Sequence, residues 1–323
     1  MRWIWVSLLV LGLVVSGKTT VADAWPTRPV RIVLTFAAGG SPDFVGRALA
    51  QKLSEMFGES VYVENRTGGN GNIGVDYVAK SEPDGYTLLL AADNQFSVNP
   101  KFDADLPYQV TDFTPISLIA EWYFVLVATP SLEADNIGEL IALAKHRGAG
   151  KINFASTGTF GTQQLAMELL QQLGDFKLTD VPYRGAGQAY PDLLAGRTQL
   201  MLTGTAGSLP HLRSGQLKPL AVTSPSRIDC LPDVPTVGEQ GFADLETPAY
   251  VGLYAPAGTP KTVVAKLVEQ VTQATASPDF RERLAAAGLT AVGSTSEELA
   301  ERTDRDSVKW TKILRAMGAR DNQ

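Results

Sequence analysis

The fold of this chain is indicated first by the stretch V-R-I-V-L-T-F-A-A-G-G-S-P-D, residues 30–43. Residues 30–36 are apolar and rich in β-branched side chains, which predicts a buried strand. The glycines that follow predict a turn, and apolar residues at four-residue spacing then predict a helix that ends near Phe57. Ser41 and Pro42 suit the N-cap and the first position of that helix.

Strand and helix patterns alternate from this unit toward the C-terminus, in two series. The first series ends with a strand over residues 86–92. The second begins with a long strand-like stretch at 116–128, and a further strand over 250–255 precedes a tail of helical patterns. Short links between alternating elements predict an α/β protein with open, mostly parallel sheets and helices on both faces.

Two α/β units are therefore expected, with the chain crossing between them twice. We assign residues 25–125 plus 248–323 to lobe 1 and residues 126–247 to lobe 2. The C-terminal helical patterns have no strand series of their own, so we expect these helices to return and pack on lobe 1. A cleft between two such lobes can close on a small ligand.

The first 24 residues have the features of an export signal. Arg2 gives a positive start, Ile4–Val15 is an apolar run, and Ala22-Asp23-Ala24 has the small-x-small pattern of a cleavage site. The run of about 12 residues is shorter than the roughly 20 that span a bilayer. We expect cleavage after Ala24, a periplasmic location and no stable membrane insertion afterwards. An uncleaved membrane anchor is the alternative.

The composition excludes several classes of function. The net charge of −6 disfavours a nucleic-acid partner, and a single Cys excludes an internal disulfide and a Cys-based zinc cluster. Two His residues leave little material for metal catalysis, and neither G-x-S-x-G nor H-E-x-x-H is present. Asp43 and Asp93 could lie close together, as in glycoside hydrolysis, but capping or hinge bonding is at least as plausible for them. We expect no metal, no cofactor and no catalytic residue.

Two glycine motifs resemble nucleotide-binding sequences but stand in the wrong context. Residues 12–19 match the P-loop pattern and lie within the export signal. Residues 69–74 match the dinucleotide fingerprint but occupy the second strand-to-helix turn rather than the first. We therefore expect neither motif to bind a nucleotide.

Three loops at predicted strand ends have the chemistry to bind an anion. Ligands of open α/β sheets lie beyond the carboxyl ends of the strands, where helix N-termini present free N–H groups. Residues 37–43 supply glycine backbone, residues 156–162 supply four hydroxyls, and residues 183–187 supply Arg184. The alternatives are a tight turn for the first loop, a polar surface loop for the second, and a solvated surface Arg for the third.

Motifs in a characteristic order extend across nearly the whole chain after residue 24. They are Trp25-Pro26-Thr27-Arg28-Pro29, residues 36–43 with Arg47, Val63-Glu64-Asn65-Arg66, residues 83–88, Val181-Pro182-Tyr183-Arg184-Gly185 and residues 255–260. In this order the sequence resembles the solute-binding receptors of tripartite tricarboxylate transporters, the Bug receptors. The resemblance implies a two-lobed periplasmic binding protein, or Venus-flytrap, fold that closes on a small organic carboxylate and delivers it to membrane transporter subunits.

The resemblance and the loops together predict the ligand-binding residues. In the family a carboxylate is held by the first Gly-Gly loop and by the Ser/Thr-rich loop of the second lobe. The residues expected to bind the ligand are Ala38, Gly39, Gly40, Ser41, Asp43, Asp93, Ser156, Thr157, Gly158, Thr159, Phe160, Gly161, Thr162, Gln163, Tyr183, Arg184 and Thr203.

The sequence departs from the family pattern at several of these positions. Pro42 stands where members commonly have Thr, which removes one hydroxyl and one N–H from the first loop. Residues 203–205 replace a frequent Asp-Asn pair, which makes an amino-acid ligand less expected. Phe160, with Trp122 and Tyr123 near the first crossover, could favour a flat apolar ligand body.

Two other functions remain open at this stage. A periplasmic ligand-sensing module for a signalling partner would share the cleft and differ only in its partner. An exported hydrolase is disfavoured, because neither His has an evident nucleophile partner in the sequence.

Overall fold

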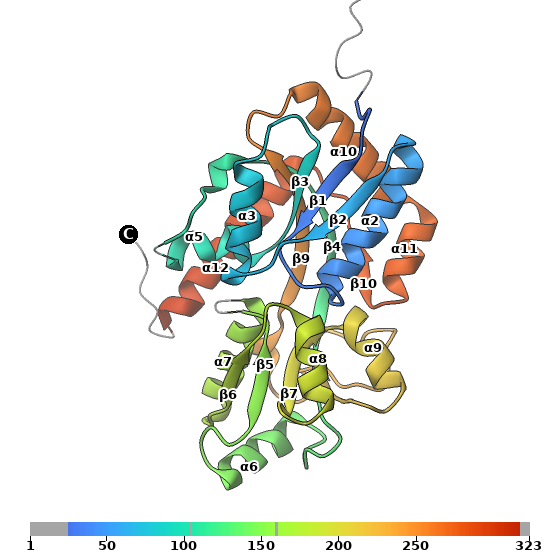
Figure 1. Ribbon diagram of the computed structural model, residues 1–323. Helices are drawn as coiled ribbons and strands as arrows, with labels where there is room; N and C mark the ends of the chain where they lie inside the picture. The colour runs from blue at the N-terminus through green and yellow to red at the C-terminus, as the bar shows by residue number, and fades with distance from the viewer. Residues whose placement is uncertain (1–24, 104, 159–160, 317–323) are drawn as a thin grey trace, which may run out of the picture.

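The computed structural model describes residues 25–103, 105–158 and 161–316. Figure 1 shows two lobes, one above the other, joined by the long strand β4 (Phe113–Ala128) and by β9 (Pro248–Pro256) beside it. The expected α/β fold with two lobes is confirmed. The predicted export signal, residues 1–24, lies outside the described residues.

Lobe 1 contains the first strand–helix series and the C-terminal segments. Strands β2, β1 and β3 pair in parallel, β9 runs antiparallel to β3, and β4 runs antiparallel to β9. Strands β1 to β4 therefore point the same way, and the sheet is mostly parallel as expected. The elements of this part are β1 (Val30–Leu34), α2 (Ser41–Phe57), β2 (Val61–Asn65), α3 (Asn72–Ala79), β3 (Thr87–Ala92), α4 (Asn94–Ser97), α5 (Asn99–Phe102), α10 (Lys261–Ala276), α11 (Pro278–Ala285), β10 (Leu289–Ala291) and α12 (Ser296–Ala316).

Lobe 2 repeats the arrangement with its own strands. β6 pairs with β5 and β5 with β7 in parallel, whereas the second half of β4 pairs antiparallel with β7 and β8. The elements are α6 (Ile137–Arg147), β5 (Asn153–Ser156), α7 (Thr162–Gly174), β6 (Thr179–Pro182), α8 (Ala186–Leu194), β7 (Leu200–Gly204), α9 (Thr205–Arg213) and β8 (Lys218–Val222).

The two connections between the lobes are tied together at Thr223. β4 pairs with β9 up to Tyr123 and with β7 from Phe124 onward, so one strand belongs to both sheets. The hydroxyl of Thr223 accepts from the N–H of Phe124 at 2.9 Å and donates to the carbonyl of Thr247 at 3.0 Å, on the returning segment. This side chain therefore bonds to both segments that connect the lobes.

The apolar spacing of α2 packs that helix onto its sheet. Val45, Leu49 and Leu53, at four-residue spacing, are fully buried in the main core cluster with Ile32 and Leu34 of β1. A buried leucine truncated to alanine costs about 2–5 kcal/mol, so this face anchors the helix. This packing positions the start of α2. It thereby also positions the loop of residues 37–43 that leads into the helix, here called the glycine loop.

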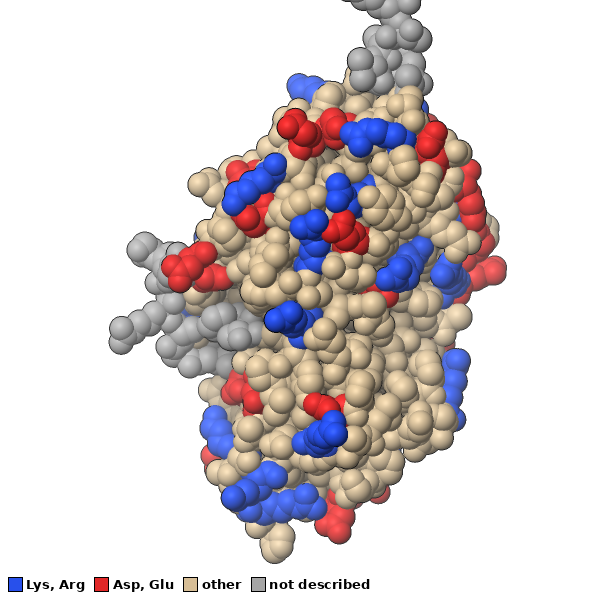
Figure 2. All heavy atoms as spheres, viewed as in Figure 1, with Lys and Arg blue, Asp and Glu red and all other residues tan. Residues whose placement is uncertain are grey.

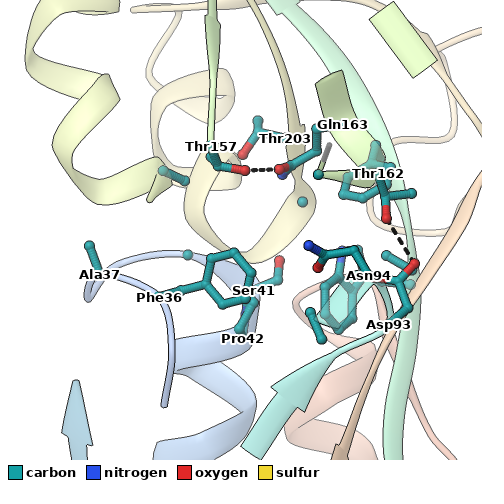
Figure 3. Close-up of a pocket in the computed structure, with 18 residues that line it drawn as sticks. Phe36, Ala37, Ser41, Pro42, Asp93, Asn94, Thr157, Thr162, Gln163 and Thr203 are labelled. Carbon is teal, nitrogen blue, oxygen red and sulfur yellow. Dashed lines mark hydrogen bonds between the residues drawn. The ribbon is translucent and has the colours of Figure 1, made fainter. Parts of the chain in front are cut away.

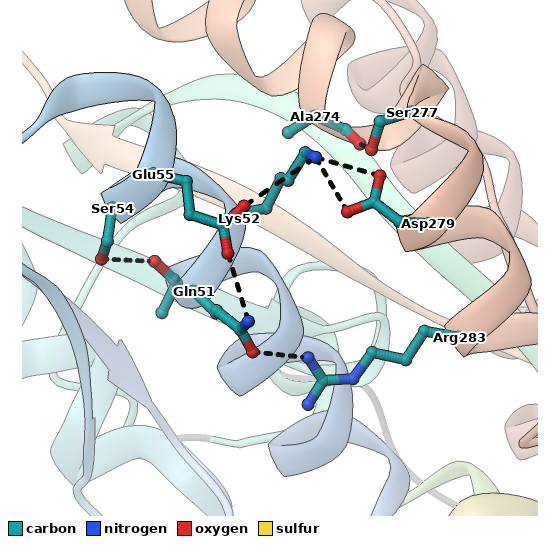
Figure 4. Close-up of polar contacts among 9 residues, drawn as sticks. Gln51, Lys52, Ser54, Glu55, Ala274, Ser277, Asp279 and Arg283 are labelled. Carbon is teal, nitrogen blue, oxygen red and sulfur yellow. Dashed lines mark hydrogen bonds and ion pairs between the residues drawn. The ribbon is translucent and has the colours of Figure 1, made fainter.

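The C-terminal helices return to lobe 1, as expected from the sequence. Lys52 of α2 donates to both carboxylate oxygens of Asp279 in α11, at 2.8 and 2.9 Å (Figure 4). In the same close-up Arg283 donates to Gln51 at 2.8 Å. Figure 2 shows basic and acidic side chains mixed over this face of the upper lobe, so no single charge sign dominates it.

Some local predictions were wrong. Helix α9 was not predicted, because Pro210 inside the helix removes one backbone donor and interrupts the pattern. His211 lies in its last turn. Ser41 is the first helical residue and Gly40 the N-cap of α2. Strand β10 and the short α4 and α5 also lack a sequence signal, because a few residues show no periodicity. Within the described part of the chain, no helix is long and apolar enough to cross a membrane.

Candidate ligand-binding site

A cleft opens between the lobes at the carboxyl ends of β1, β3, β5 and β7. Figure 3 shows Ser41, Pro42, Asp93 and Asn94 of lobe 1 facing Thr157 and other residues of lobe 2 across this space. The cleft holds about 560 Å³ of empty space, including the part open to solvent. Its lining residues are Phe36, Ala37, Gly40, Ser41, Pro42, Ala92, Asp93, Asn94, Trp122, Phe124, Thr157, Gly161, Thr162, Gln163, Ala186, Thr203, Gly204 and Ala249.

Helices α2, α7, α8 and α9 all begin beside the cleft. Their N-caps are Gly40, Gly161, Gly185 and Gly204, and none of these has a side chain that could cap the helix. The first N–H groups of a helix have no intrahelical acceptor and carry a partial positive charge. Glycine caps leave these donors available, so the cleft is built to receive an anion.

Two buried side-chain donors of the cleft have no hydrogen-bond partner among the described residues. They are the hydroxyl of Ser41, in the first turn of α2, and the indole N–H of Trp122, on β4. The two residues are only 3% and 5% exposed, although both line the cleft. Leaving such a group unsatisfied costs roughly 1–3 kcal/mol, which an acceptor from a ligand would recover.

Asp93 is the only charged residue among those that line the cleft. It follows β3, is 4% exposed, and accepts a hydrogen bond of 2.8 Å from the hydroxyl of Thr162 in lobe 2. Burial disfavours its charged form and raises its pKa to about 7, although the bond from Thr162 opposes the shift. The lining thus contains no fixed cation, and a ligand anion would rely on neutral donors.

The remaining hydroxyls of the cleft already have partners. Thr157 donates to Gln163, within the loop that leads into α7. Thr203 shares a hydrogen bond of 3.2 Å with the hydroxyl of Tyr190. The hydroxyls of Thr157 and Thr203 are therefore each engaged by a neighbouring side chain.

Asp43 has a different place from the one expected. Its carboxylate accepts from the backbone N–H of Gly39 at 3.1 Å, from Asn65 at 3.0 Å and from Arg47 at 2.9 Å. It does not line the cleft, because Asn65 at the end of β2 holds it on the far side of the loop. Asp43 therefore braces the glycine loop instead of facing the ligand space.

The other expected residues fall into three groups. Gly40, Ser41, Asp93, Thr157, Gly161, Thr162, Gln163 and Thr203 come together around the cleft, while Ala38, Gly39 and Ser156 are neighbours of lining residues without lining it. Gly158, Tyr183 and Arg184 line a neighbouring cavity with residues 67–71, and this cavity shares Phe36 and Thr157 with the cleft. Thr159 and Phe160 lie outside the described residues.

Sequence reasoning missed most of the apolar walls. Phe36, Ala92, Phe124 and Ala249 line the cleft without belonging to any of the three predicted loops. Ala37 and Ala186 lie in those loops but were not among the expected ligand-binding residues, and Asn94 and Gly204 were also missed. Trp122, which the sequence analysis related to a flat apolar ligand body, does line the cleft. A signal for Gly204 existed, because a glycine between a strand and a helix marks a candidate anion site, but α9 itself was not predicted.

Comparisons with known proteins agree with this architecture. A family model described as tripartite tricarboxylate transporter family receptor matches residues 45–319. The structure of the periplasmic binding protein BugD is similar, with a TM-score of 0.87 and 34% identity, covering 91% of this chain and 99% of that chain. R. palustris Rpa4515 with adipate gives a TM-score of 0.88 and 32% identity, over 91% and 98% of the two chains. MatC from Rhodopseudomonas palustris with bound malate has a TM-score of 0.84 and 28% identity, covering 90% of this chain and 100% of that chain.

The fold and the cleft define a two-lobed periplasmic solute-binding protein. Since the family model covers most of its length, the chain belongs to the tripartite tricarboxylate transporter receptor family, the family indicated by its sequence motifs. This is a family of solute-binding receptors, not of enzymes.

Proposed function

We propose that this protein is an exported receptor that captures a small organic carboxylate in the interlobe cleft and delivers it to the membrane subunits of a tripartite tricarboxylate-type transporter. The observation that carries the proposal is the convergence of glycine-capped helix starts and partnerless donors on one cleft. Neighbours in the family were solved with adipate and with malate, which supports a carboxylate as the ligand class.

The electrostatics of the cleft favour a carboxylate over a neutral or cationic solute. Each helix start contributes roughly 0.3–1 kcal/mol toward an anion, and up to about 2 kcal/mol where the geometry is partly buried. Asp93, with its raised pKa, loses part of its negative charge near neutral pH and then repels an anion less. Asp43 offers no free acid for an ammonium group, since its carboxylate is occupied by Arg47 and Gly39.

Closure of the two lobes around the ligand is supported by their contacts beside the cleft. The N–H of Ala37 donates to the carbonyl of Arg184 at 3.3 Å, across the lobes. A Cβ atom on Gly187 would lie 1.9 Å from the carbonyl oxygen of Ala38. Glycine at position 187 lets the backbones of the two lobes approach this closely; we call this contact between Gly187 and Ala38 the seam. We propose that lobe 1, residues 25–125 with 248–323, moves against lobe 2, residues 126–247, about the two crossover segments.

Export is part of the same proposal, with residues 1–24 as signal and cleavage after Ala24. Trp25 supports this boundary, because it is 3% exposed and packs edge-on against Phe57. Lys266 of α10 donates to its carbonyl at 2.6 Å. The folded part of the chain is therefore anchored from its first described residue. We further propose that the receptor is not catalytic and needs no cofactor.

A thermal-unfolding screen against mono-, di- and tricarboxylic acids tests ligand capture. An acid at about 100 times its dissociation constant should raise the free energy of unfolding by about 2.7 kcal/mol. The corresponding neutral amides serve as controls and should have no effect. Failure of every acid, together with turnover of an ester or glycoside, would contradict the proposal. Affinity capture of the transporter subunits, and not of a sensor kinase, tests delivery.

A further inference from the structure

Helix α7 of lobe 2 buries one of its apolar side chains among residues of lobe 1. Leu165 is 3% exposed, and the apolar cluster that contains it has no other described residue of lobe 2. Its companions come from the segment of α4 and α5 and from α12, all in lobe 1: Val98, Phe102, Trp310 and Leu314. Figure 1 shows the C-terminal end of α12 reaching the boundary between the lobes, above α7. An apolar contact therefore joins the two lobes.

The face of α7 that carries Leu165 also reaches the cleft. Thr162, which lines the cleft and donates to Asp93 of lobe 1 at 2.8 Å, precedes Leu165 by three residues. Side chains at this spacing lie on one face of a helix. The neighbouring Met167 and Leu170 belong instead to the main core cluster. A shift of α7 toward a ligand therefore presses Leu165 against lobe 1 at the same time.

Polar contacts also join the lobes around the cleft. The hydroxyl of Thr205, the first residue of α9, donates to the carbonyl of Ala287 in lobe 1 at 2.6 Å. The N–H of Ala37 donates to the carbonyl of Arg184. Water replaces such partners when the lobes separate, so each of these bonds adds little net free energy to closure. Leu165 differs, because separation of the lobes returns an apolar side chain to water, and the burial of apolar surface is favourable in proportion to its area.

We propose that Leu165, Trp310 and Leu314 form an apolar clasp, through which the C-terminal helix holds the closed form and slows release of the ligand. The inference rests on the proposed function and adds to it a device that sets how long the ligand stays bound. The three residues lie outside the lining of the cleft, so the clasp acts on closure and not by touching the ligand. A contact that favours the closed form also raises the apparent affinity, because the ligand binds that form best. Since the clasp forms after the ligand has entered, it changes the rate of release and not the rate of entry.

The test compares Leu165→Ala and Leu314→Ala, which shorten the clasp from its two sides, with Leu170→Ala as the matched control. Leu170 lies on the same helix as Leu165 and is similarly buried, but it belongs to the main core cluster. Titration calorimetry and stopped-flow displacement, both with adipate and with malate, measure affinity and release. We expect each clasp variant to release the acid about tenfold faster and to lose affinity by the same factor, and the double variant to lose less than the product. Leu170→Ala should unfold more easily but release the acid as the wild type does.

A second measurement needs no ligand and follows the one cysteine of the chain. Cys230 of lobe 2 packs against lobe 1, since a Cβ atom on Gly288 would lie 2.6 Å from its sulfur. Opening of the lobes frees the thiol, so iodoacetamide should modify Leu165→Ala up to about tenfold faster than the wild type or Leu170→Ala. Equal thiol reactivity together with equal release rates would show that the clasp is wrong, and the proposed function would stand. If no acid of the thermal screen binds the wild type, the proposed function is overturned, and with it the role of the clasp in release.

Discussion

The hydroxyl of Thr162 donates a hydrogen bond of 2.8 Å to the carboxylate of Asp93, and this bond joins the two lobes across the cleft. Asp93 follows β3 of lobe 1, and Thr162 is the first residue of α7 in lobe 2. The bond lies at the edge of the proposed ligand space. Its strength depends on whether Asp93 is charged, and the groups around Asp93 control that charge.

Asp93 should make the closed form sensitive to pH. Burial raises its pKa to about 7, Asp306 raises it further, and Thr162 and Arg302 oppose the shift. Between pH 4 and 7 the folded protein retains a proton that the unfolded chain, with a pKa near 3.9, has released. The free energy of unfolding therefore falls as pH rises through this window, with a slope that approaches about 1.4 kcal/mol per pH unit.

The variant Asp93→Asn isolates this contribution, because an amide oxygen can still accept from Thr162 but does not titrate. Denaturant unfolding at pH 5, 6, 7 and 8 should show the wild type losing stability relative to Asp93→Asn as pH rises to 7. Above pH 7 the difference should become constant. Parallel pH profiles for the two proteins would show that Asp93 does not retain its proton in this window.

Gly187→Ala should weaken ligand binding by at least tenfold, because its new methyl group would meet the carbonyl oxygen of Ala38 in the other lobe. Gly238→Ala is the control; a Cβ there makes only ordinary contacts, the nearest 3.5 Å from Glu246. Small-angle scattering should show that Gly187→Ala stays more open than the control at saturating acid. Equal affinities for the two variants would contradict the importance of the seam.

Asp43→Ala should lower the free energy of unfolding by about 1–3 kcal/mol, because Gly39 N–H, Asn65 and Arg47 lose a shared acceptor. Affinity should also fall, since the loop that presents Gly40 and Ser41 is no longer braced. Chemical denaturation and calorimetry measure the two effects. Direct ligation would instead lower affinity and leave stability unchanged.

Leu49→Ala should cost about 2–5 kcal/mol of unfolding free energy, because Leu49 is fully buried under the sheet of lobe 1. Asp279→Asn should have a much smaller effect on stability, because its ion pair with Lys52 is at the surface, where solvent screens it. Urea unfolding of both variants compares them directly. A larger loss for Asp279→Asn would show that the contact between α2 and α11 outweighs the core in holding α2.

Periodicity was sufficient to predict the elements that carry the site. The buried strand at residues 30–36, the helix ending at Phe57 and the strand over residues 86–92 are present within a few residues of the expected bounds. Helix α9 was missed because Pro210 interrupts its pattern. The contacts of Asp43 could not be predicted, because sequence spacing does not show which side of a loop a carboxylate faces. Its partner Asn65 is 22 positions away in sequence.

The sequence by itself determined two α/β units, glycine-rich helix starts and the absence of a Ser–His or metal-binding motif, because these features depend on residues close together in the chain. The tertiary structure decided which donors are left without acceptors. Ser41, Trp122 and Gly204 belong to three separate elements, and their meeting depends on the register of β4 against β9 and β7. Long-range pairing of this kind leaves no local pattern, so only the folded chain shows which residues line the cleft together.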